Sequence, residues 1–245
     1  MPIYTETVPS VWSIFRQRWR ETRAHKGFSA TTREIGSDLW EFLRESTPER
    51  KRRRYGDLEY DWDHHIDTTS ATVTHRGRLI AAISGAPYQP TDPAEFREMM
   101  KALTIDLREF TFLDIGSGKG RTLLMASEFP FRRILGVELV QELHEIAAQN
   151  IAAFSSTDQK CHNIQCICAD ARDFQFPPEP LLLYLFNPLP APAMQTMLEH
   201  LQQSLQQTPR HIRVIYHNPL SEQVLLDSGF LKKIGGTEQY SIFSN

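Results

Sequence analysis

The stretch Leu113–Arg121, LDIGSGKGR, places three glycines within five positions directly after a short apolar run. A loop of this composition lets the backbone turn tightly after a strand and approach a ligand closely. The phosphate P-loop does not fit, because it requires glycine where the chain has Leu113 and serine or threonine where it has Gly120. The dinucleotide fingerprint fails at Arg121, where it demands glycine or alanine. The pattern is instead D-x-G-x-G-x-G, beginning at Asp114.

The chain around this loop alternates short apolar runs with helical patterns, and turn residues separate them. Alternating units of this kind predict a parallel sheet, because two parallel strands need a crossover that is usually a helix. Two final strand-like runs joined by the turn GGT predict a closing antiparallel hairpin. The predicted fold is therefore α/β, with a doubly wound, mostly parallel, seven-stranded, Rossmann-like sheet. We expect strands over 110–115, 132–137, 163–169, 181–186, 211–216, 230–236 and 238–244, and helices over 91–103, 120–128, 141–154, 192–206 and 221–228.

Length and composition limit the class of protein. A chain of 245 residues, 40% of them hydrophobic, can bury a substantial core, and a net charge of -3 gives no overall bias toward polyanions. No apolar run approaches the roughly 18 residues that a membrane span needs. The N-terminus lacks the layout of a secretory signal, and all three cysteines lie between positions 161 and 168. We therefore expect a cytoplasmic protein without membrane contact.

The first 85 residues differ in character and are predicted to form a helical extension before a domain spanning 86–245. Apolar spacing indicates amphipathic helices over 9–27 and 33–46. The segment 49–70 has neither helical nor strand periodicity and is predicted to be a loop. Its basic run ERKRRR has the composition of a solvated loop and lacks interleaved aromatic residues, so we do not expect nucleic acid as a partner.

The glycine pattern resembles that of the class I S-adenosylmethionine-dependent methyltransferases, and the resemblance continues over about residues 86–245. It implies S-adenosylmethionine as the cofactor. Glu138 ends the second predicted strand, where the family binds ribose hydroxyls through a carboxylate. Asp170 and Ala171 follow the third strand, where the family recognises adenine through an acidic side chain and a backbone N–H. The loop residues that the resemblance places against the cofactor are Asp114, Gly116, Ser117, Gly118 and Gly120.

The resemblance also implies the reaction, a methyl transfer by in-line displacement. Asn187 and Pro188 follow the fourth strand, where the family closes over the methyl group. The side-chain carbonyl of Asn187 and the backbone carbonyls of the turn NPLP, residues 187–190, could hold an amine acceptor. Amino-methylating members read Asn/Asp-Pro-Pro-Tyr/Phe at this place, whereas this chain continues with Leu189 and Pro190. Asn187 is the candidate catalytic residue, and a strand-ending turn is its structural alternative.

The segment APYQPTDPAEF, residues 86–96, looks like a sub-group that includes protein lysine methyltransferases, in which a Tyr-x-Pro-Thr/Ser segment lies against the cofactor. By this resemblance Tyr88 and Thr91 are candidate cofactor-binding residues. Alternatively, Tyr88 packs against the sheet edge and Thr91 caps a helix. His217, at the end of the fifth strand, is open between an acid-base role and that of an ordinary hydrogen-bonded residue.

The methyl acceptor is not identified by these residues. A protein lysine is the most specific candidate and a small molecule is its nearest rival, while a non-catalytic cofactor-binding module and a nicotinamide-dependent oxidoreductase stay as alternatives. DWDHH and CHNIQCIC contain metal-ligand residue types without the paired spacing of a zinc site, so we expect no metal. Residues 55–65 are hypothesised to fold over the cofactor mouth as a lid, with a structural cap on the sheet edge as the alternative.

Overall fold

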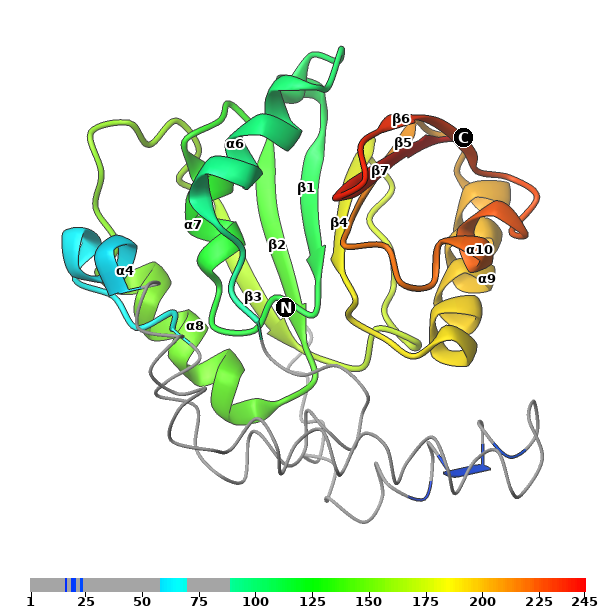
Figure 1. Cartoon of the computed structure of the whole chain (residues 1–245), viewed down its shortest axis with the longest axis horizontal. Coiled ribbons are helices and arrows are strands. Elements are labelled where there is room, and N and C mark those ends of the chain that lie inside the picture. The colour runs from blue at the N-terminus through cyan, green and yellow to red at the C-terminus, as the bar shows by residue number, and fades with distance from the viewer. Residues whose placement is uncertain (1–15, 17–18, 21–22, 24–57, 70–88) are drawn as a thin grey trace.

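The computed structural model describes residues 58–69 and 89–245, together with Arg16, Trp19, Arg20 and Arg23, which are helical. Several predictions lie outside the described residues: the rest of the helices over 9–27 and 33–46, the basic run, Tyr88 and the domain boundary at 85/86. The sheet and its helices come from the part of the chain that begins at residue 89 (Figure 1).

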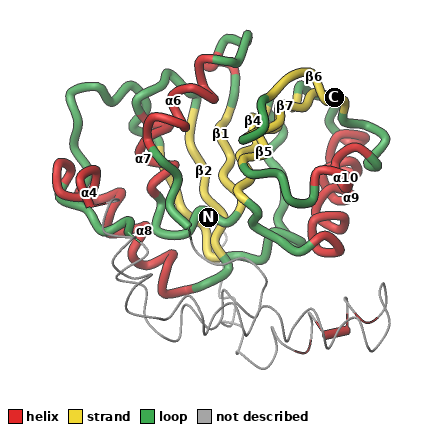
Figure 2. The backbone as a smooth tube through the Cα atoms, viewed as in Figure 1, coloured by secondary structure: helices red, strands yellow, loops and turns green. Residues whose placement is uncertain are grey.

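Seven strands form one sheet in the order β3-β2-β1-β4-β5-β7-β6 (Figures 1 and 2). Neighbouring strands are parallel except for β7, which runs antiparallel to β5 and β6. The prediction of a doubly wound, mostly parallel seven-stranded sheet that ends in an antiparallel hairpin is confirmed. The strands are β1 Thr111–Ile115, β2 Arg133–Glu138, β3 Ile164–Cys168, β4 Leu181–Phe186, β5 Ile212–His217, β6 Lys232–Gly236 and β7 Tyr240–Ser244.

Helices cover both faces of the sheet, because the inner strands are apolar on both sides. In β4, Leu183 and Leu185 face one core, while Leu182 and Tyr184 face the other. Helices α9 and α10 pack on the first face, and α6 and α7 pack on the second. The helices are α4 Leu58–His64, α6 Pro93–Lys101, α7 Arg121–Ser127, α8 Gln141–Ala153, α9 Ala191–Gln207 and α10 Glu222–Leu226, with a short 3-10 turn at Leu107–Glu109.

Every strand and helix predicted after residue 90 is present, with bounds within two residues of those expected. Helix α6 is capped by Asp92, whose side chain accepts hydrogen bonds from the N–H groups of Ala94 and Glu95. The alternative role of Thr91 as the helix cap is therefore wrong. Because β1 to β5 are parallel, their carboxyl ends meet at one edge of the sheet, and this edge carries the predicted site.

The prediction of an irregular loop over 49–70 is wrong for Leu58–His64, which form helix α4. The helix is stabilised by tertiary contacts that a search for apolar periodicity does not detect. The Tyr60 ring lies 4.6 Å from the ring of His64, and the His64 ring lies 5.1 Å from that of Phe154, just after α8. Asp61 on the same helix is buried and paired with Arg121. One polar and two aromatic side chains thus take the place of an apolar stripe.

Candidate cofactor site

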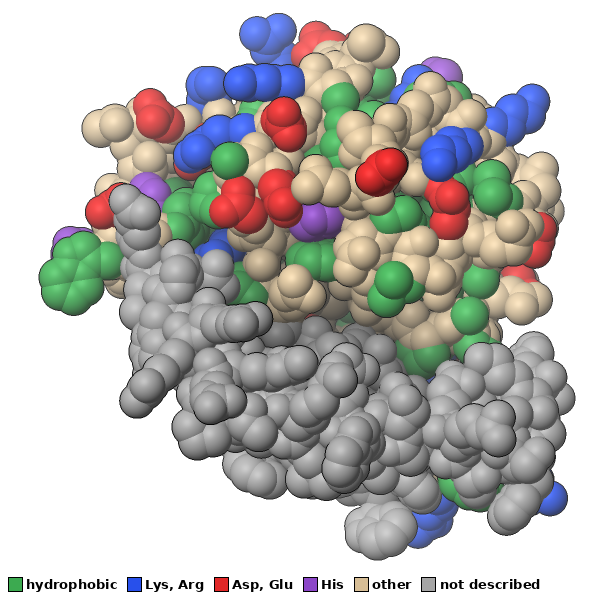
Figure 3. Space-filling model, viewed as in Figure 1, with side chains coloured by type: hydrophobic (Ala, Val, Ile, Leu, Met, Phe, Trp, Pro, Cys, Tyr) green, Lys and Arg blue, Asp and Glu red, His purple; other side chains and the backbone are tan. Residues whose placement is uncertain are grey.

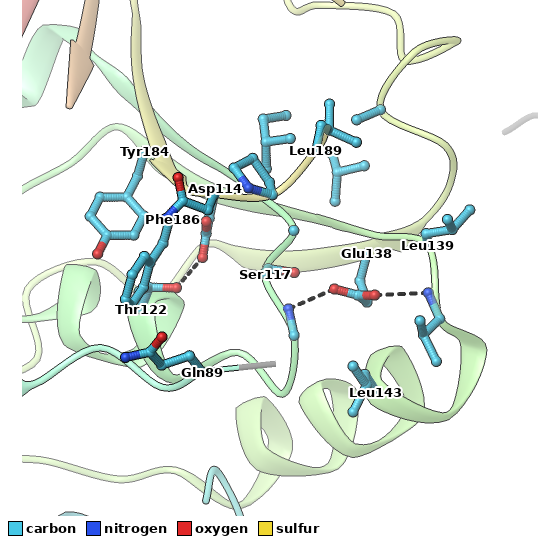
Figure 4. Close-up of a pocket in the computed structure, with 18 of the residues that line it drawn as sticks. Gln89, Asp114, Ser117, Thr122, Glu138, Leu139, Leu143, Tyr184, Phe186 and Leu189 are labelled. Carbon is cyan, nitrogen blue, oxygen red and sulfur yellow. Dashed lines mark hydrogen bonds between the residues drawn. The ribbon is translucent and has the colours of Figure 1, made fainter. Parts of the chain in front are cut away.

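A pocket opens at the carboxyl ends of β1 to β4 and contains about 910 Å³ of space, its opening to solvent included. Figure 4 shows an elongated site, with Tyr184 and Gln89 at one end, Leu139 and Leu143 at the other, and Ser117 between them. Gly120 does not line the pocket. Nine of the residues predicted from the sequence do line it: Thr91, Asp114, Gly116, Ser117, Gly118, Glu138, Asp170, Ala171 and Asn187.

Glu138 is held in place by the backbone on both sides of the pocket. One carboxylate oxygen accepts the N–H of Gly118 at 2.8 Å, and the other accepts the N–H of Val140 at 2.8 Å (Figure 4). Burial raises the pKa of Glu138, and these N–H donors oppose that shift. A carboxylate can accept more than one hydrogen bond at each oxygen. Glu138 therefore joins the glycine loop to the start of α8 and keeps acceptor capacity for ligand hydroxyls.

The loop between β1 and α7 requires glycine at two positions for different reasons. Gly116 has a φ of +78°, and a Cβ there would lie 2.9 Å from the Cβ of Pro188. Gly120, the cap residue of α7, has a φ of +83°, and a Cβ there would lie 3.2 Å from the Cβ of Ala147 in α8. Gly116 thus permits contact with the segment after β4, while Gly120 permits α7 and α8 to approach each other.

Asp114 is buried at the end of β1 and accepts a short hydrogen bond from the Thr122 hydroxyl (Figure 4). Burial raises the pKa of Asp114 to about 7; the Thr122 hydroxyl opposes the shift, and the nearby charge of Glu138 adds to it. Both protonation states are therefore populated near neutral pH. A cation bound in the pocket would favour the ionised carboxylate.

This pKa predicts a pH dependence of cofactor binding. S-adenosylmethionine carries a sulfonium and an ammonium group, so its affinity should rise between about pH 6 and pH 8 as Asp114 loses its proton, by at most about tenfold per pH unit. Calorimetric titrations across this range should show the rise in wild type and not in Asp114→Asn. The uncharged-sulfur product, S-adenosylhomocysteine, should show a smaller rise. Equal pH slopes in the two proteins would exclude Asp114 as the titrating group.

Asp170 is oriented by a neighbour that sequence reasoning missed. One carboxylate oxygen accepts the backbone N–H and the Nε–H of Arg172, both at 2.9 Å, and the other accepts a short bond from its guanidinium. The available signal was the Asp-x-Arg spacing at a turn, where an aspartate commonly accepts the N–H two residues on. Ala171 is buried and lines the pocket beside Asp170. Adenine binding by Asp170 stays a prediction.

Asn187 lines the pocket in the left-handed conformation, with a φ of 47°. Its side-chain carbonyl oxygen accepts the hydroxyl of Tyr216 at 3.0 Å and the N–H of Leu220 at 3.3 Å. These bonds fix the turn after β4, in agreement with the alternative interpretation of Asn187 as a residue of a strand-ending turn. To hold an amine through this oxygen, Asn187 would have to exchange one of these partners, so its catalytic role stays a prediction.

A hydrogen-bonded series of side chains runs from Thr91 at the pocket wall through Tyr184 to His217. The Thr91 hydroxyl lies 2.9 Å from the Tyr184 hydroxyl, which lies 2.8 Å from Nδ1 of His217, and Nε2 of His217 lies 3.3 Å from a carboxylate oxygen of Glu95. The His217 ring stacks on Phe186 with centroids 4.1 Å apart. Burial lowers the pKa of His217 to about 4, so its imidazole ring is uncharged at neutral pH.

Sequence reasoning also missed Tyr184, although it is the single polar residue of the run LLLYLF. We expect Tyr184→Phe to destabilise the fold by about 1–3 kcal/mol, because it leaves the buried Thr91 hydroxyl and His217 Nδ1 without their partner. Urea unfolding at pH 7 measures this. Tyr240→Phe is the control, since Tyr240 is also buried and no hydrogen bond of its hydroxyl to the described residues is seen. Equal effects of the two substitutions would show that the hydrogen bonds of Tyr184 contribute nothing to stability.

The sequence predicted no metal site at either DWDHH, residues 61–65, or CHNIQCIC, residues 161–168. Cys166 lies against His144 and Ser117, with its sulfur 3.3 Å from His144 Nδ1. Across 58–69 and 89–245, no three His, Cys, Asp or Glu side chains gather closely enough to hold a metal ion. The helices of the same ranges include none with the length and apolarity to cross a membrane.

The parallel sheet, the glycine loop and the acidic residues at the carboxyl ends of β1 to β3 together define the class I methyltransferase fold. The sequence matches the model of a family described as "Putative methyltransferase" over residues 108–190. This range carries the glycine loop, Glu138, Asp170 and Asn187. The match supports the predicted resemblance to the class I S-adenosylmethionine-dependent methyltransferases over this part of the chain, and it leaves the acceptor and the lysine-specific sub-group untested.

Solved structures with similar folds include methyltransferases with different acceptors. The ribosomal protein L11 methylase from Lactobacillus delbrueckii subsp. bulgaricus has a TM-score of 0.43 and 14% identity, covering 64% of this chain and 80% of that chain. The tRNA (m1A58) methyltransferase TrmI from Aquifex aeolicus has a TM-score of 0.45 and 17% identity, covering 64% and 70%. No curated protein matches the sequence. These similarities do not select an acceptor.

Proposed function

We propose that this protein transfers the methyl group of S-adenosylmethionine to an amine nitrogen, with a protein lysine as the acceptor. The observation that carries the proposal is that one pocket is lined by the glycine loop, by Glu138 and by Thr91. The first two are the cofactor-binding features of the methyltransferase resemblance, and Thr91 belongs to the segment that resembles the lysine-methylating sub-group.

The charged groups of the pocket suit a cationic cofactor. Three carboxylates line the pocket, Asp114, Glu138 and Asp170. Arg121 also borders it, but its guanidinium donates to Thr68 and Asp61. Glu138 would accept the ribose hydroxyls, and the Asp114 carboxylate would balance positive charge. When bound, S-adenosylmethionine supplies an activated methyl group for in-line displacement.

The chain would act on the acceptor mainly by orientation and by excluding water. A lysine must lose its proton before it attacks, and acceptors near the site favour the neutral, aligned amine. Because the side-chain oxygen of Asn187 is bonded to Tyr216 and Leu220, we assign this task to the backbone carbonyls of the turn at 187–190. On the face shown in Figure 3, acidic and basic side chains are interspersed over the described surface.

The test has a binding step and a transfer step. Calorimetric titration should show binding of S-adenosylmethionine and not of NAD, which separates this function from the oxidoreductase alternative. Transfer is then followed with a methyl-labelled cofactor, using a lysine-rich peptide and the same peptide with arginine in place of lysine. Label on the lysine peptide alone supports the proposal. Label on tRNA or on small amines instead would contradict the lysine acceptor while keeping the methyltransferase, and the exclusion of nucleic acid stays a prediction until then.

A second candidate function is a non-catalytic module that binds the cofactor. It is favoured by the Asn187 side-chain oxygen, whose two bonds within the protein leave it without an obvious role in holding an acceptor. Its signature would be tight S-adenosylmethionine binding with no label transferred to peptide, RNA or small amine.

A further inference from the structure

Lys119, in the glycine loop, is buried and turned away from the pocket. Its side chain is 0% exposed, and its ammonium donates to the Asp67 carboxylate at 2.8 Å and to the carbonyl of Thr69 at 2.9 Å. A buried cation is costly unless it is paired and hydrogen-bonded. The position of this loop residue therefore depends on a segment that precedes it by about fifty residues in the chain.

Arg121, at the first position of α7, binds the same segment. Its Nε–H donates to the Thr68 hydroxyl at 2.6 Å, and its terminal N–H donates to the Asp61 carboxylate at 3.1 Å. The guanidinium carbon lies 5.3 Å from the centre of the Tyr60 ring. Both cations of the sequence GKGR thus have partners within residues 58–69.

The segment is itself fixed by polar contacts. The Asp61 carboxylate accepts the N–H groups of Thr68 and Thr69 at 2.6 and 2.9 Å. Asn150 in α8 donates to the carbonyl of Asp67 at 2.8 Å and to the carbonyl of Lys119 at 2.9 Å. One amide of α8 therefore bonds both the segment and the glycine loop, so that the two are positioned against the same side chain.

We propose that residues 58–69 are a positioning element of the cofactor site. The segment binds Lys119 and Arg121 and so keeps the glycine loop in the conformation that binds the cofactor. None of residues 58–69 lines the pocket, so the segment acts through the glycine loop and not by contact with the ligand. The inference rests on the proposed cofactor. It also gives part of the N-terminal region a role beyond the predicted extension and lid, both of which stay untested.

The arrangement predicts a reciprocal coupling. If the docked segment favours the binding-competent loop, bound cofactor must favour the docked segment by the same free energy. The backbone N–H of Asp67 reports docking directly, because it donates to the side-chain oxygen of Asn150 in α8 at 2.9 Å. The N–H groups of Thr68 and Thr69 report the internal order of the segment, because both donate to Asp61, the carboxylate that binds Arg121. Their hydrogen exchange should slow when S-adenosylhomocysteine is added, whereas a segment with a purely structural role would exchange at a rate independent of the ligand.

Asp61 and Asp63 provide a matched pair of variants on helix α4. Asp61 is 6% exposed and bonded to Arg121, whereas Asp63 is exposed. Titration of the full chain with S-adenosylhomocysteine should give an affinity at least about tenfold weaker for Asp61→Asn, equivalent to about 1.4 kcal/mol, and unchanged for Asp63→Asn. Lys119→Met should weaken binding similarly. Phe243→Leu, a substitution of a buried side chain on β7, controls for general destabilisation.

The outcomes separate this inference from the proposed function. Slower exchange at Thr68 and Thr69 with ligand, together with weaker binding by folded Asp61→Asn, supports the inference. If Asp61→Asn does not fold, Lys119→Met and the exchange of the wild-type protein decide it. If folded Asp61→Asn and Lys119→Met bind the ligand as tightly as wild type does, and the ligand does not slow hydrogen exchange at Thr68 and Thr69, the inference is wrong and the proposed function is unaffected. No binding by wild type would overturn the proposed function and the inference with it.

Discussion

Gly116→Ala is expected to lower cofactor affinity by at least about 100-fold, equivalent to about 2.7 kcal/mol, and to destabilise the fold. At a φ of +78° an alanine costs about 1–2 kcal/mol. Its Cβ would also lie 2.9 Å from the Cβ of Pro188, so the loop and the segment after β4 must separate. That movement displaces Gly118, whose N–H holds Glu138. Titration with S-adenosylmethionine and urea unfolding measure the two effects.

Gly229→Ala is the matched control for this substitution. Gly229 has a φ of +77°, almost that of Gly116, but a Cβ there would meet no atom within 4 Å. It should therefore show the conformational cost alone, about 1–2 kcal/mol of stability, with cofactor affinity unchanged. If Gly116→Ala behaved like Gly229→Ala in both measurements, the contact with Pro188 would not shape the cofactor site.

The sheet could be predicted from the sequence because its inner strands are apolar on both faces and its helices begin and end at turn residues. The run LLLYLF, for example, is buried along almost all of β4, and such a run has few alternatives in an alternating α/β pattern. The predicted site residues followed from the fold itself. Once strands are parallel, the residues after each strand gather at one edge, and Asp114, Glu138 and Asp170 lie there as expected.

What could not be predicted depends on polar contacts between distant segments. Helix α4 was missed because Tyr60 and Asp61 pack through Arg121, about sixty positions later, and not through an apolar stripe. The sequence gives no sign either that Lys119, in the glycine loop, donates to Asp67 and Thr69. Such pairs leave no periodic signal in the sequence, because each charged or polar residue alone is typical of a solvated surface.

Replacement of Glu138 by alanine should weaken cofactor binding strongly while leaving the protein folded. Glu138→Ala removes the acceptor of the Gly118 and Val140 N–H groups, which costs stability. It also removes a buried carboxylate whose pKa burial raises, and this offsets part of that cost. Affinity for S-adenosylmethionine should fall by at least about 100-fold, or about 2.7 kcal/mol, because charge-assisted hydrogen bonds to the ribose are lost together with the loop anchor. Glu145→Ala, on the exposed side of α8, should bind as wild type does.

Two roles of Glu138, binding the ribose and anchoring the loop, can be told apart by changing the ligand as well as the protein. S-adenosylhomocysteine and its 2′-deoxy analogue differ by one ribose hydroxyl. If Glu138 accepts that hydroxyl, the wild-type protein should bind the deoxy analogue about tenfold more weakly, equivalent to about 1.4 kcal/mol, and a variant that retains weak binding, Glu138→Gln, should discriminate less between the two. Equal discrimination by wild type and Glu138→Gln would mean that the carboxylate only holds Gly118 and Val140 in place, and that the ribose is recognised by another group in the pocket.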